Sequence, residues 1–394
     1  MKVLIANLGS TSLKYRLFDF SGNEERLLTR GGFERVEDYS KAVDGCLREL
    51  TDGGHIGSAA DLAAVGFKTV LADGVTGCVS LDDRVLKAME AGNTVAPAHN
   101  PAYLTGVRVF SERMPKTPLI GLFETAFYQW IPEPAKRYGV PSSWFDAGVR
   151  RWGFHGASHK FIAERSAELL GRDDVADRAR KLYVDDGRSK TEGAPLRVVS
   201  CHLGGSSSVT GICDGVAIGN SMGMSPQSGL PNNNRVGDVD AFALIHMMRT
   251  QGLSIDDVER QLCSEAGLKG LSGGYNDLRD IQTHAESGDE AAKLAVDFLI
   301  HETRRWIGSY HLQLNGVDAL VFTAGIGENR SEIRAEICAD LDQLGIQIDE
   351  AKNQAAQGEE AEISAANSKV KVFVIPTNEE LVVAREVKRF LENN

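Results

Sequence analysis

The feature that most constrains the fold is a pair of similar segments separated by about half the chain. Residues 3–19 (VLIANLGSTSLKYRLFD) and residues 198–214 (VVSCHLGGSSSVTGICD) each contain a β-rich run, a Gly/Ser cluster and a second β-rich run. Small residues between two such runs predict a hairpin. Glycines there let the backbone approach a ligand, and hydroxyl and amide groups can hold phosphate oxygens. Two copies predict two similar domains that hold a nucleotide between them.

The composition limits the class of protein and its partners. The chain has 394 residues, enough for two domains, and a formal net charge of −12. It has no block of Lys and Arg that would suit a nucleic-acid backbone, and no apolar run approaches the roughly 18 residues of a membrane span. The six cysteines are scattered without a CxxC pair, and the chain begins directly on a strand pattern. We therefore expect a cytoplasmic protein with reduced thiols.

Strand and helix patterns alternate along the rest of the chain, which predicts α/β domains with mixed sheets. A polar, Pro-containing connection over residues 138–151 is a candidate domain boundary. The expected strands lie at residues 63–71, 119–123, 319–323 and 371–375, and the expected helices at residues 80–91, 158–170, 287–314 and 379–392.

Two glycine-containing segments carry features of phosphate binding. In the first hairpin, Ser10, Ser12 and Lys14 provide hydroxyls and a cation that can surround a phosphate or its Mg²⁺. The alternative is an ordinary Ser-rich turn followed by a solvated lysine. In residues 322–330 (FTAGIGENR), a buried strand runs into a glycine turn and then into a helix, whose N-terminus favours negative charge.

Histidines and one arginine are further candidates for anion binding. His155 and His159 are four residues apart and can share a helix face, while His202 ends a strand before Gly204. This spacing also suits a metal, but without an HExxH pattern we expect hydrogen-bonded or phosphate-contacting histidines, with buried core histidines as the alternative. Arg235 stands on a polar loop, where its guanidinium matches carboxylate and phosphate; the alternative is a surface salt-bridge loop.

The motifs form one ordered set: VLIANLGSTSLKY, AHNPA, FETAF, RRWGFHGASHK, CHLGGSSS, NSMGMSPQSGL, RVGDVD, DLRD, FTAGIGENR and IPTNEEL. Together they resemble, nearly end to end, the acetate and propionate kinases of the actin–Hsp70–sugar kinase superfamily. The resemblance implies two duplicated actin-like ATPase (ribonuclease H-like) α/β domains, with mixed sheets flanked by helices and a cleft between the domains. It implies a first domain over residues 1–148, completed by a C-terminal helix at 381–394, and a second over residues 149–380.

The resemblance also implies a reaction and a set of roles. The γ-phosphoryl group of ATP would pass reversibly to acetate or a similar short-chain carboxylate, giving an acyl phosphate and ADP. The metal would be Mg²⁺ or Mn²⁺, and the assembly a homodimer without nucleic-acid or membrane partners. The implied metal ligands are Asn7 and Glu379, and the implied catalytic residues are Lys68, Glu124, His155 and Arg235. The implied carboxylate-binding residues are Val70, Ala98, His99, Phe154 and Pro226. The implied nucleotide-binding residues are Ser10, Ser12, Lys14, His202, Gly204, Gly205, Ser206, Asp277, Leu278, Arg279, Gly325, Ile326, Gly327, Glu328 and Asn329.

Several positions depart from the family pattern. Lys68 stands where the family has arginine, Glu124 where it has aspartate, and Ala98 where it commonly has leucine. The smaller Ala98 predicts room for a carboxylate larger than acetate. The altered pair Gly205-Ser206 leaves open another phosphoryl donor, such as pyrophosphate, and Lys68 with Glu124 leaves open a catalytically weak nucleotide-binding protein.

Overall fold

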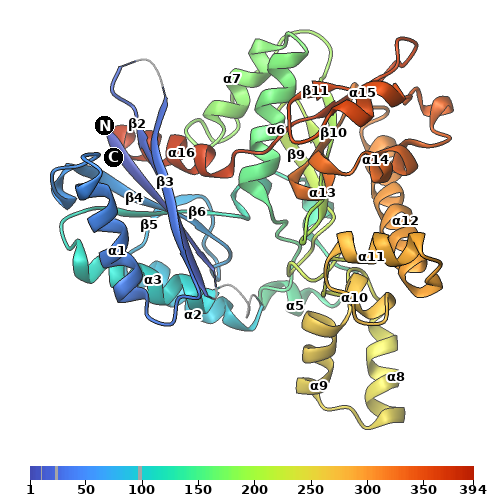
Figure 1. Ribbon diagram of the computed structural model, residues 1–394, viewed down its shortest axis with the longest axis horizontal. Helices are drawn as coiled ribbons and strands as arrows, with labels where there is room; N and C mark the ends of the chain where they lie inside the picture. The colour runs from blue at the N-terminus through green and yellow to red at the C-terminus, as the bar shows by residue number, and fades with distance from the viewer. Residues whose placement is uncertain (10, 23–24, 96–99) are drawn as a thin grey trace.

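The computed structural model describes residues 1–9, 11–22, 25–95 and 100–394, and these form two lobes, each built on a six-stranded sheet (Figure 1). In spatial order, the first sheet comprises β3 (Arg26–Glu34), β2 (Ser12–Asp19), β1 (Lys2–Gly9), β4 (Leu62–Thr69), β6 (Leu119–Phe123) and β5 (Cys78–Ser80). The second comprises β11 (Ala361–Glu362), β12 (Lys371–Val374), β10 (Ala319–Thr323), β7 (Arg197–His202), β8 (Ser208–Cys213) and β9 (Val216–Asn220).

The two sheets share one connection pattern. Each begins with three antiparallel strands, β1-β2-β3 or β7-β8-β9, and continues with two strands parallel to the first, β4 and β6 or β10 and β12. Both predicted hairpins are present, since Gly9 pairs with Ser12 in one lobe and His202 with Ser208 in the other. The predicted duplicated α/β fold is therefore confirmed, whereas the exact domain boundaries stay a prediction.

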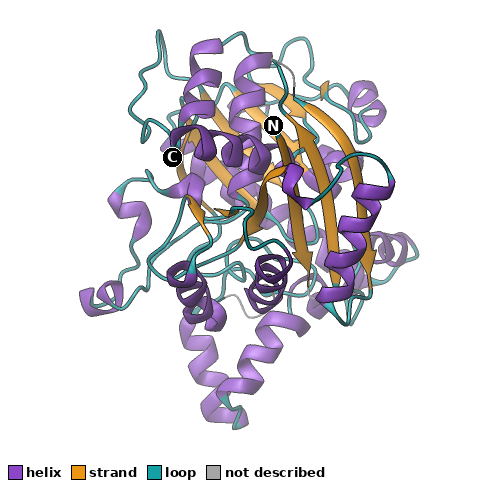
Figure 2. Ribbon diagram, turned by 90° about the vertical axis from the view of Figure 1, so that its left-hand side faces the viewer, coloured by secondary structure: helices purple, strands orange, loops and turns teal. Residues whose placement is uncertain are grey.

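Helices cover both faces of each twisted sheet (Figure 2). The first sheet packs against α1 (Tyr39–Asp52), α2 (Asp83–Ala91) and α3 (Asn100–Arg113) on one face and α16 (Glu379–Asn393) on the other. The second packs against α11 (Leu278–Glu286), α12 (Glu290–Gln313) and α14 (Ser331–Cys338) on one face and α6 (Gly156–Leu169) and α7 (Asp173–Lys181) on the other. The remaining helices are α4 (Glu133–Lys136), α5 (Ser142–Asp146), α8 (Ala241–Gln251), α9 (Ile255–Arg260), α10 (Gly267–Leu271), α13 (Ala324–Asn329) and α15 (Glu350–Ala355).

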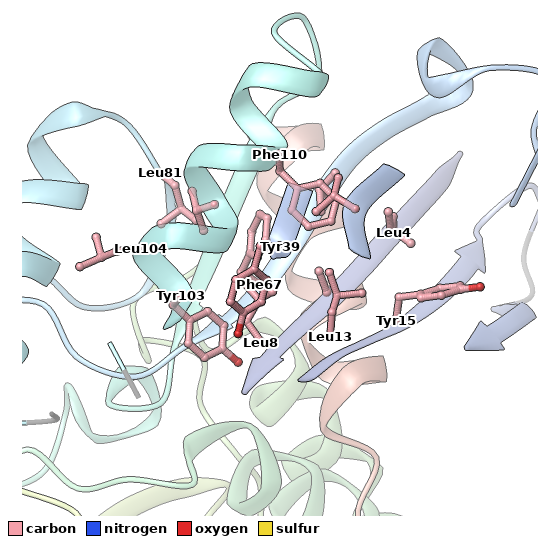
Figure 3. Close-up of a cluster of buried hydrophobic side chains, with 14 of the residues drawn as sticks. Leu4, Leu8, Leu13, Tyr15, Tyr39, Phe67, Leu81, Tyr103, Leu104 and Phe110 are labelled. Carbon is pink, nitrogen blue, oxygen red and sulfur yellow. The ribbon is translucent and has the colours of Figure 1, made fainter. Parts of the chain in front are cut away.

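The side chains of β1 explain how the first sheet is held on two sides. Because successive side chains of a strand point to opposite faces, Leu4 and Leu8 enter the core under α1 and α3, whereas Val3 and Ile5 enter the core under α16. Figure 3 shows the first of these cores, in which the rings of Phe67 and Phe110 meet edge to face.

The C-terminal helix α16 returns the chain to the first lobe, so that both termini lie in that lobe (Figure 1). It approaches β4 so closely that a Cβ at Gly66 would lie 2.8 Å from Val387. Between the sheets, α16 also packs against α6, where Lys160 and Glu386 form an ion pair of 2.9 Å with side chains only 1% and 2% exposed. Within the described residues, no helix is long and apolar enough to cross a membrane.

Candidate active site

A cavity of about 340 Å³ lies where the carboxyl ends of parallel strands from both lobes meet, the usual place for a ligand site in such sheets. Lys68 stands near the end of β4, Glu124 follows β6, and His202 ends β7. The sequence-predicted residues that line this cavity are Asn7, Lys68, Val70, Glu124, Phe154, His155, His202, Gly204, Gly205, Ser206, Pro226, Arg235 and Glu379.

A lysine bridges two glutamates at one side of the cavity. Nζ of Lys68 lies 2.6 Å from Oε2 of Glu379, the first residue of α16, and 3.1 Å from Oε1 of Glu124. Burial opposes the charge of Lys68, but the two carboxylates outweigh it and raise the pKa of Lys68 well above its ordinary value. Burial raises the pKa of Glu124, whereas Lys68 overcomes burial at Glu379 and lowers the pKa of that carboxyl.

The oxygens left free in this cluster fit a hard divalent cation. Oε2 of Glu124 and Oε1 of Glu379 are buried and have no hydrogen-bond partner in the described chain. Oδ1 of Asn7 accepts a hydrogen bond of 2.8 Å from the hydroxyl of Tyr103. No group of three or more His, Cys, Asp or Glu among the described residues is placed to hold a metal. The donor set suits Mg²⁺, which commonly takes one or two carboxylates and completes its shell with water and substrate phosphates.

Arg235 brings a cation to the same cavity from the second lobe. Its Nη1 donates to the carbonyl oxygen of Pro226 at 3.1 Å, and burial lowers the pKa of its guanidinium. In the described part of the chain, no carboxylate forms a salt bridge with Arg235. Its remaining N–H groups are therefore available to an anionic ligand.

A strained backbone places His155 opposite Glu124. His155 has a left-handed conformation with φ 58° and immediately precedes α6. The next residue, Gly156, donates its N–H to the carbonyl oxygen of Glu124 at 3.0 Å, and a Cβ there would lie 2.3 Å from that oxygen. Such strain persists only where the surroundings impose it, and it is common at functional sites.

Three imidazoles meet at the wall of the cavity: His159 and His202 are buried, and His155 is half-buried. The rings of His155 and His202 are stacked with centroids 4.0 Å apart, and His159 lies 6.1 Å from His202. Burial lowers the pKa of His202 to about 4, and burial together with the neighbouring rings lowers the pKa values of His155 and His159 well below the ordinary value. The predicted hydrogen-bonded histidines are confirmed, because each Nδ1 lies within 2.8 Å of a serine hydroxyl.

We expect the free energy of unfolding to fall as the pH decreases from about 7 to 5, because these histidines titrate at about 6.5 only when unfolded. Below that pH the unfolded chain binds protons that folded His155, His159 and His202 do not bind. The free energy of unfolding therefore falls below pH 6.5, by at most about 1.4 kcal/mol per pH unit for each ring. Urea unfolding across this range measures the slope. His159→Gln should reduce it, whereas His301→Gln, at an exposed side chain, should not; equal slopes would contradict the assignment.

A second cavity of about 420 Å³ adjoins the first, and Gly204 and Gly205 line both. Beneath it, Arg334 is fully buried and donates to the carbonyl oxygens of Gly327 and Glu328 at 2.9 and 3.0 Å, which supports the glycine segment from below. The predicted nucleotide residues that line this second cavity are Gly204, Gly205, Asp277, Leu278, Arg279, Gly325, Ile326 and Asn329.

Other predicted residues lie elsewhere. Lys14 is exposed, pairs with Glu34 at 3.2 Å and lines a separate surface cavity beside β2. Ser12 stands at the end of the first hairpin, outside the lining of both cavities. Glu328 turns inward, where its Oε1 accepts from the N–H groups of Ala324 and Thr377 at 2.8 and 3.1 Å. Gly327 is buried below the second cavity, and Ser10, Ala98 and His99 lie outside the described residues.

Sequence reasoning missed several lining residues. Tyr103 faces Asn7 from α3, but an aromatic residue at helical spacing is typical of a core position. Asn233 and Arg330 line the second cavity. Arg330 ends the recognised segment FTAGIGENR, and Asn233 lies two residues before Arg235, so their positions in the sequence were the available signal.

Comparisons with known proteins agree with this geometry. Residues 30–385 match the model of the acetokinase family. The chain is 39% identical to an acetate kinase of Clostridium botulinum, over 98% of this chain and 99% of that protein, and 37% identical to an acetate kinase of Carboxydothermus hydrogenoformans over the whole of both. Among solved structures, an acetate kinase of Porphyromonas gingivalis has a TM-score of 0.85, 32% identity and 99% coverage of both chains. A propionate kinase of Francisella tularensis has a TM-score of 0.82, 29% identity and 98% coverage of both.

Proposed function

This chain belongs to the acetokinase family, and we propose that it transfers the γ-phosphoryl group of ATP to acetate or another short-chain carboxylate. The observation that carries the proposal is the composition of one cavity. Lys68 and the carboxylates of Glu124 and Glu379 line it from the first lobe, and Arg235 lines it from the second. It adjoins the second cavity at Gly204 and Gly205. A nucleotide in the second cavity would thus direct its phosphates toward the charged groups of the first.

The proposed reaction needs alignment and charge neutralisation more than a base. A carboxylate is already ionised near pH 7, so its oxygen attacks the γ-phosphorus while the bond from that phosphorus to the oxygen of ADP breaks. We assign to Arg235 the binding of the carboxylate and the transferred group, because its guanidinium faces the cavity without a carboxylate partner among the described residues. His155, whose ring lines the same cavity, would donate to the phosphoryl oxygens.

We assign the metal to the carboxylate side of the cavity. Glu379 and Asn7 would hold Mg²⁺, or Mn²⁺ in its place, with the free oxygen of Glu124 nearby. Bound there, the cation would offset the negative charge of the nucleotide phosphates. The ammonium of Lys68 offsets the repulsion between the carboxylates of Glu124 and Glu379, because it pairs with both.

The test is an acyl-phosphate assay with hydroxylamine trapping, using acetate, propionate and butyrate with ATP, GTP or pyrophosphate. We expect ATP-dependent acyl phosphate with a higher kcat/KM for propionate than for acetate, because Ala98 predicts a larger pocket than leucine would leave. A preference for acetate would overturn the size argument alone. Nucleotide binding without any acyl phosphate would favour the non-catalytic alternative, and activity with pyrophosphate alone would favour the other donor.

We also propose that a second copy of the chain covers α8, in line with the homodimer that the resemblance implies. None of its residues is buried, and it projects with α9 beyond the rest of the second lobe (Figure 1). Phe242 is 74% exposed, and Ile245, Met247 and Ile255 are exposed beside it. Apolar groups gathered in this way mark an interaction surface.

Phe242→Glu should therefore shift the protein from dimer to monomer in sedimentation equilibrium, because it places a charge in the apolar contact. Leu27→Glu, at an exposed apolar residue of the first lobe, is the matched control and should leave the mass unchanged. A dimer that persists in the Phe242 variant would exclude this surface.

A further inference from the structure

Behind His155, a chain of hydrogen bonds runs into the second lobe, and the proposed mechanism does not use it. Nδ1 of His155 lies 2.7 Å from Oγ of Ser208, which in turn lies 2.8 Å from Nε2 of His159. Nδ1 of His159 lies 2.8 Å from Oγ of Ser200. Ser200, Ser208 and His159 are completely buried, so the chain is closed to solvent at its inner end.

The number of protons restricts how these bonds are made. Burial lowers the pKa of His155 and of His159 well below the ordinary value, so each neutral ring carries one N–H near pH 7. Ser208 has a single hydroxyl proton, and the two rings are its side-chain hydrogen-bond partners in the described chain. It cannot donate to both rings, and accepting from both would leave its own buried O–H unpaired, which is costly. It therefore donates to one ring and accepts from the other.

Two arrangements satisfy Ser208 and both rings, and the second also gives the buried hydroxyl of Ser200 an acceptor. If His155 carries its proton on Nδ1, it donates to Ser208, Ser208 donates to Nε2 of His159, and His159 is also protonated on Nδ1. If His155 carries its proton on Nε2, Ser208 donates to it, His159 is also protonated on Nε2, and Ser200 donates to Nδ1 of His159. The two rings always share one tautomer.

Only the second arrangement suits an anion in the cavity. His155 lines the cavity, its Nδ1 is taken by Ser208, and its Nε2 has no protein partner in the described chain. A phosphoryl oxygen needs a donor at that atom, so it selects the form with the proton on Nε2. Through Ser208, this choice also sets the proton of His159, which touches no ligand.

We propose that Ser208, His159 and Ser200 are positioning residues that couple the tautomer of His155 to that of His159, so that an anionic phosphoryl group fixes both rings in the form protonated on Nε2. The identity of the anion rests on the proposed function. The coupling itself follows from the hydrogen-bond geometry and can be measured in a protein without any turnover.

The decisive measurement is ¹⁵N NMR of imidazole-labelled protein, with the rings of His155 and His159 assigned by substitution and inorganic phosphate as the probe. We expect both rings to show one common tautomer and phosphate to leave both protonated on Nε2. Ser208→Ala should break the link, so that phosphate changes His155 alone. Opposite tautomers in the wild-type protein, or a wild-type response confined to His155, would overturn the proposal.

Kinetics give a second readout that a merely structural role would not produce. Ser208→Ala should lower kcat about tenfold, since one buried hydrogen bond to the donor ring is lost, with little change in KM for either substrate. Ser166→Ala is the matched control, because Ser166 is equally buried on α6 and its hydroxyl donates only to the carbonyl oxygen of Ile162. Equal kcat values for the two variants would count against the coupling. If the protein makes no acyl phosphate, the proposed function fails while the NMR result still decides the coupling.

Discussion

Arg235→Ala should lower kcat/KM for the carboxylate by about a thousandfold, within the range known for arginines that stabilise phosphoryl transfer. The guanidinium is half-buried beside Pro226 and is not salt-bridged to a carboxylate in the described chain, so its charge is directed to the ligand. Its removal leaves two anions to approach each other without this cation. Steady-state acyl-phosphate assays with wild type and variant measure the effect.

Two further variants separate charge from shape at this position. Arg235→Lys keeps the positive charge but loses the planar pair of donors, so we expect activity between those of wild type and Arg235→Ala. Arg305→Ala is the control, because Arg305 is half exposed on α12. It pairs at 2.8 Å with Asp238, which lies on the loop that carries Arg235. It should retain wild-type activity. An Arg235→Ala variant that keeps more than about a tenth of wild-type activity would exclude the assigned role.

Lys68→Met should destabilise the protein by about 3 kcal/mol, the low end for breaking a buried ion pair, and should abolish most activity. The variant leaves Glu124 and Glu379 buried close to each other without the ammonium that pairs with both. The pKa of Glu124, already raised by burial, rises further, so protonation should restore part of the lost stability at acidic pH. Urea unfolding at pH 7 and pH 5 measures this difference.

A double substitution makes this prediction specific. Lys68→Met with Glu124→Gln removes one of the two negative charges and should recover part of the stability, although not the activity. Lys293→Met, which breaks an exposed pair with Asp297, should leave the free energy of unfolding nearly unchanged. If the two lysine substitutions cost the same, the bridging role of Lys68 is wrong.

The duplicated fold could be predicted because its signals are local. Each hairpin is a contiguous run of strand residues around small residues, and Gly9 pairs with Ser12 just as that pattern requires. Glu379 could be placed on a helix by its neighbours, since Asn378 caps α16 through a hydrogen bond to Leu381.

The pairings within the site could not be predicted, because they join residues far apart in the chain. Lys68 and Glu379 are separated by 311 positions and meet only through the packing of α16 on the first sheet. Lys14 shares a face of the sheet with Asn7, its cross-strand partner, yet it lies one strand further out and faces solvent. Strand alternation gives the face of a side chain, but it does not give the distance from the cavity.

The ion pair between Lys160 and Glu386 has a mechanical consequence. Lys160 lies on α6 shortly after His155, and Glu386 lies on α16 two turns after Glu379. The ion pair is therefore close to the N-terminal ends of both helices. Sliding one helix along the other would strip two buried charges of their partners, which is strongly unfavourable. Arg385 of α16 also pairs with Glu164 of α6 at 2.7 Å, so the two helices are joined at two points and resist rotation as well as sliding. This double link holds His155, at the start of α6, and Glu379, at the start of α16, in one fixed relation.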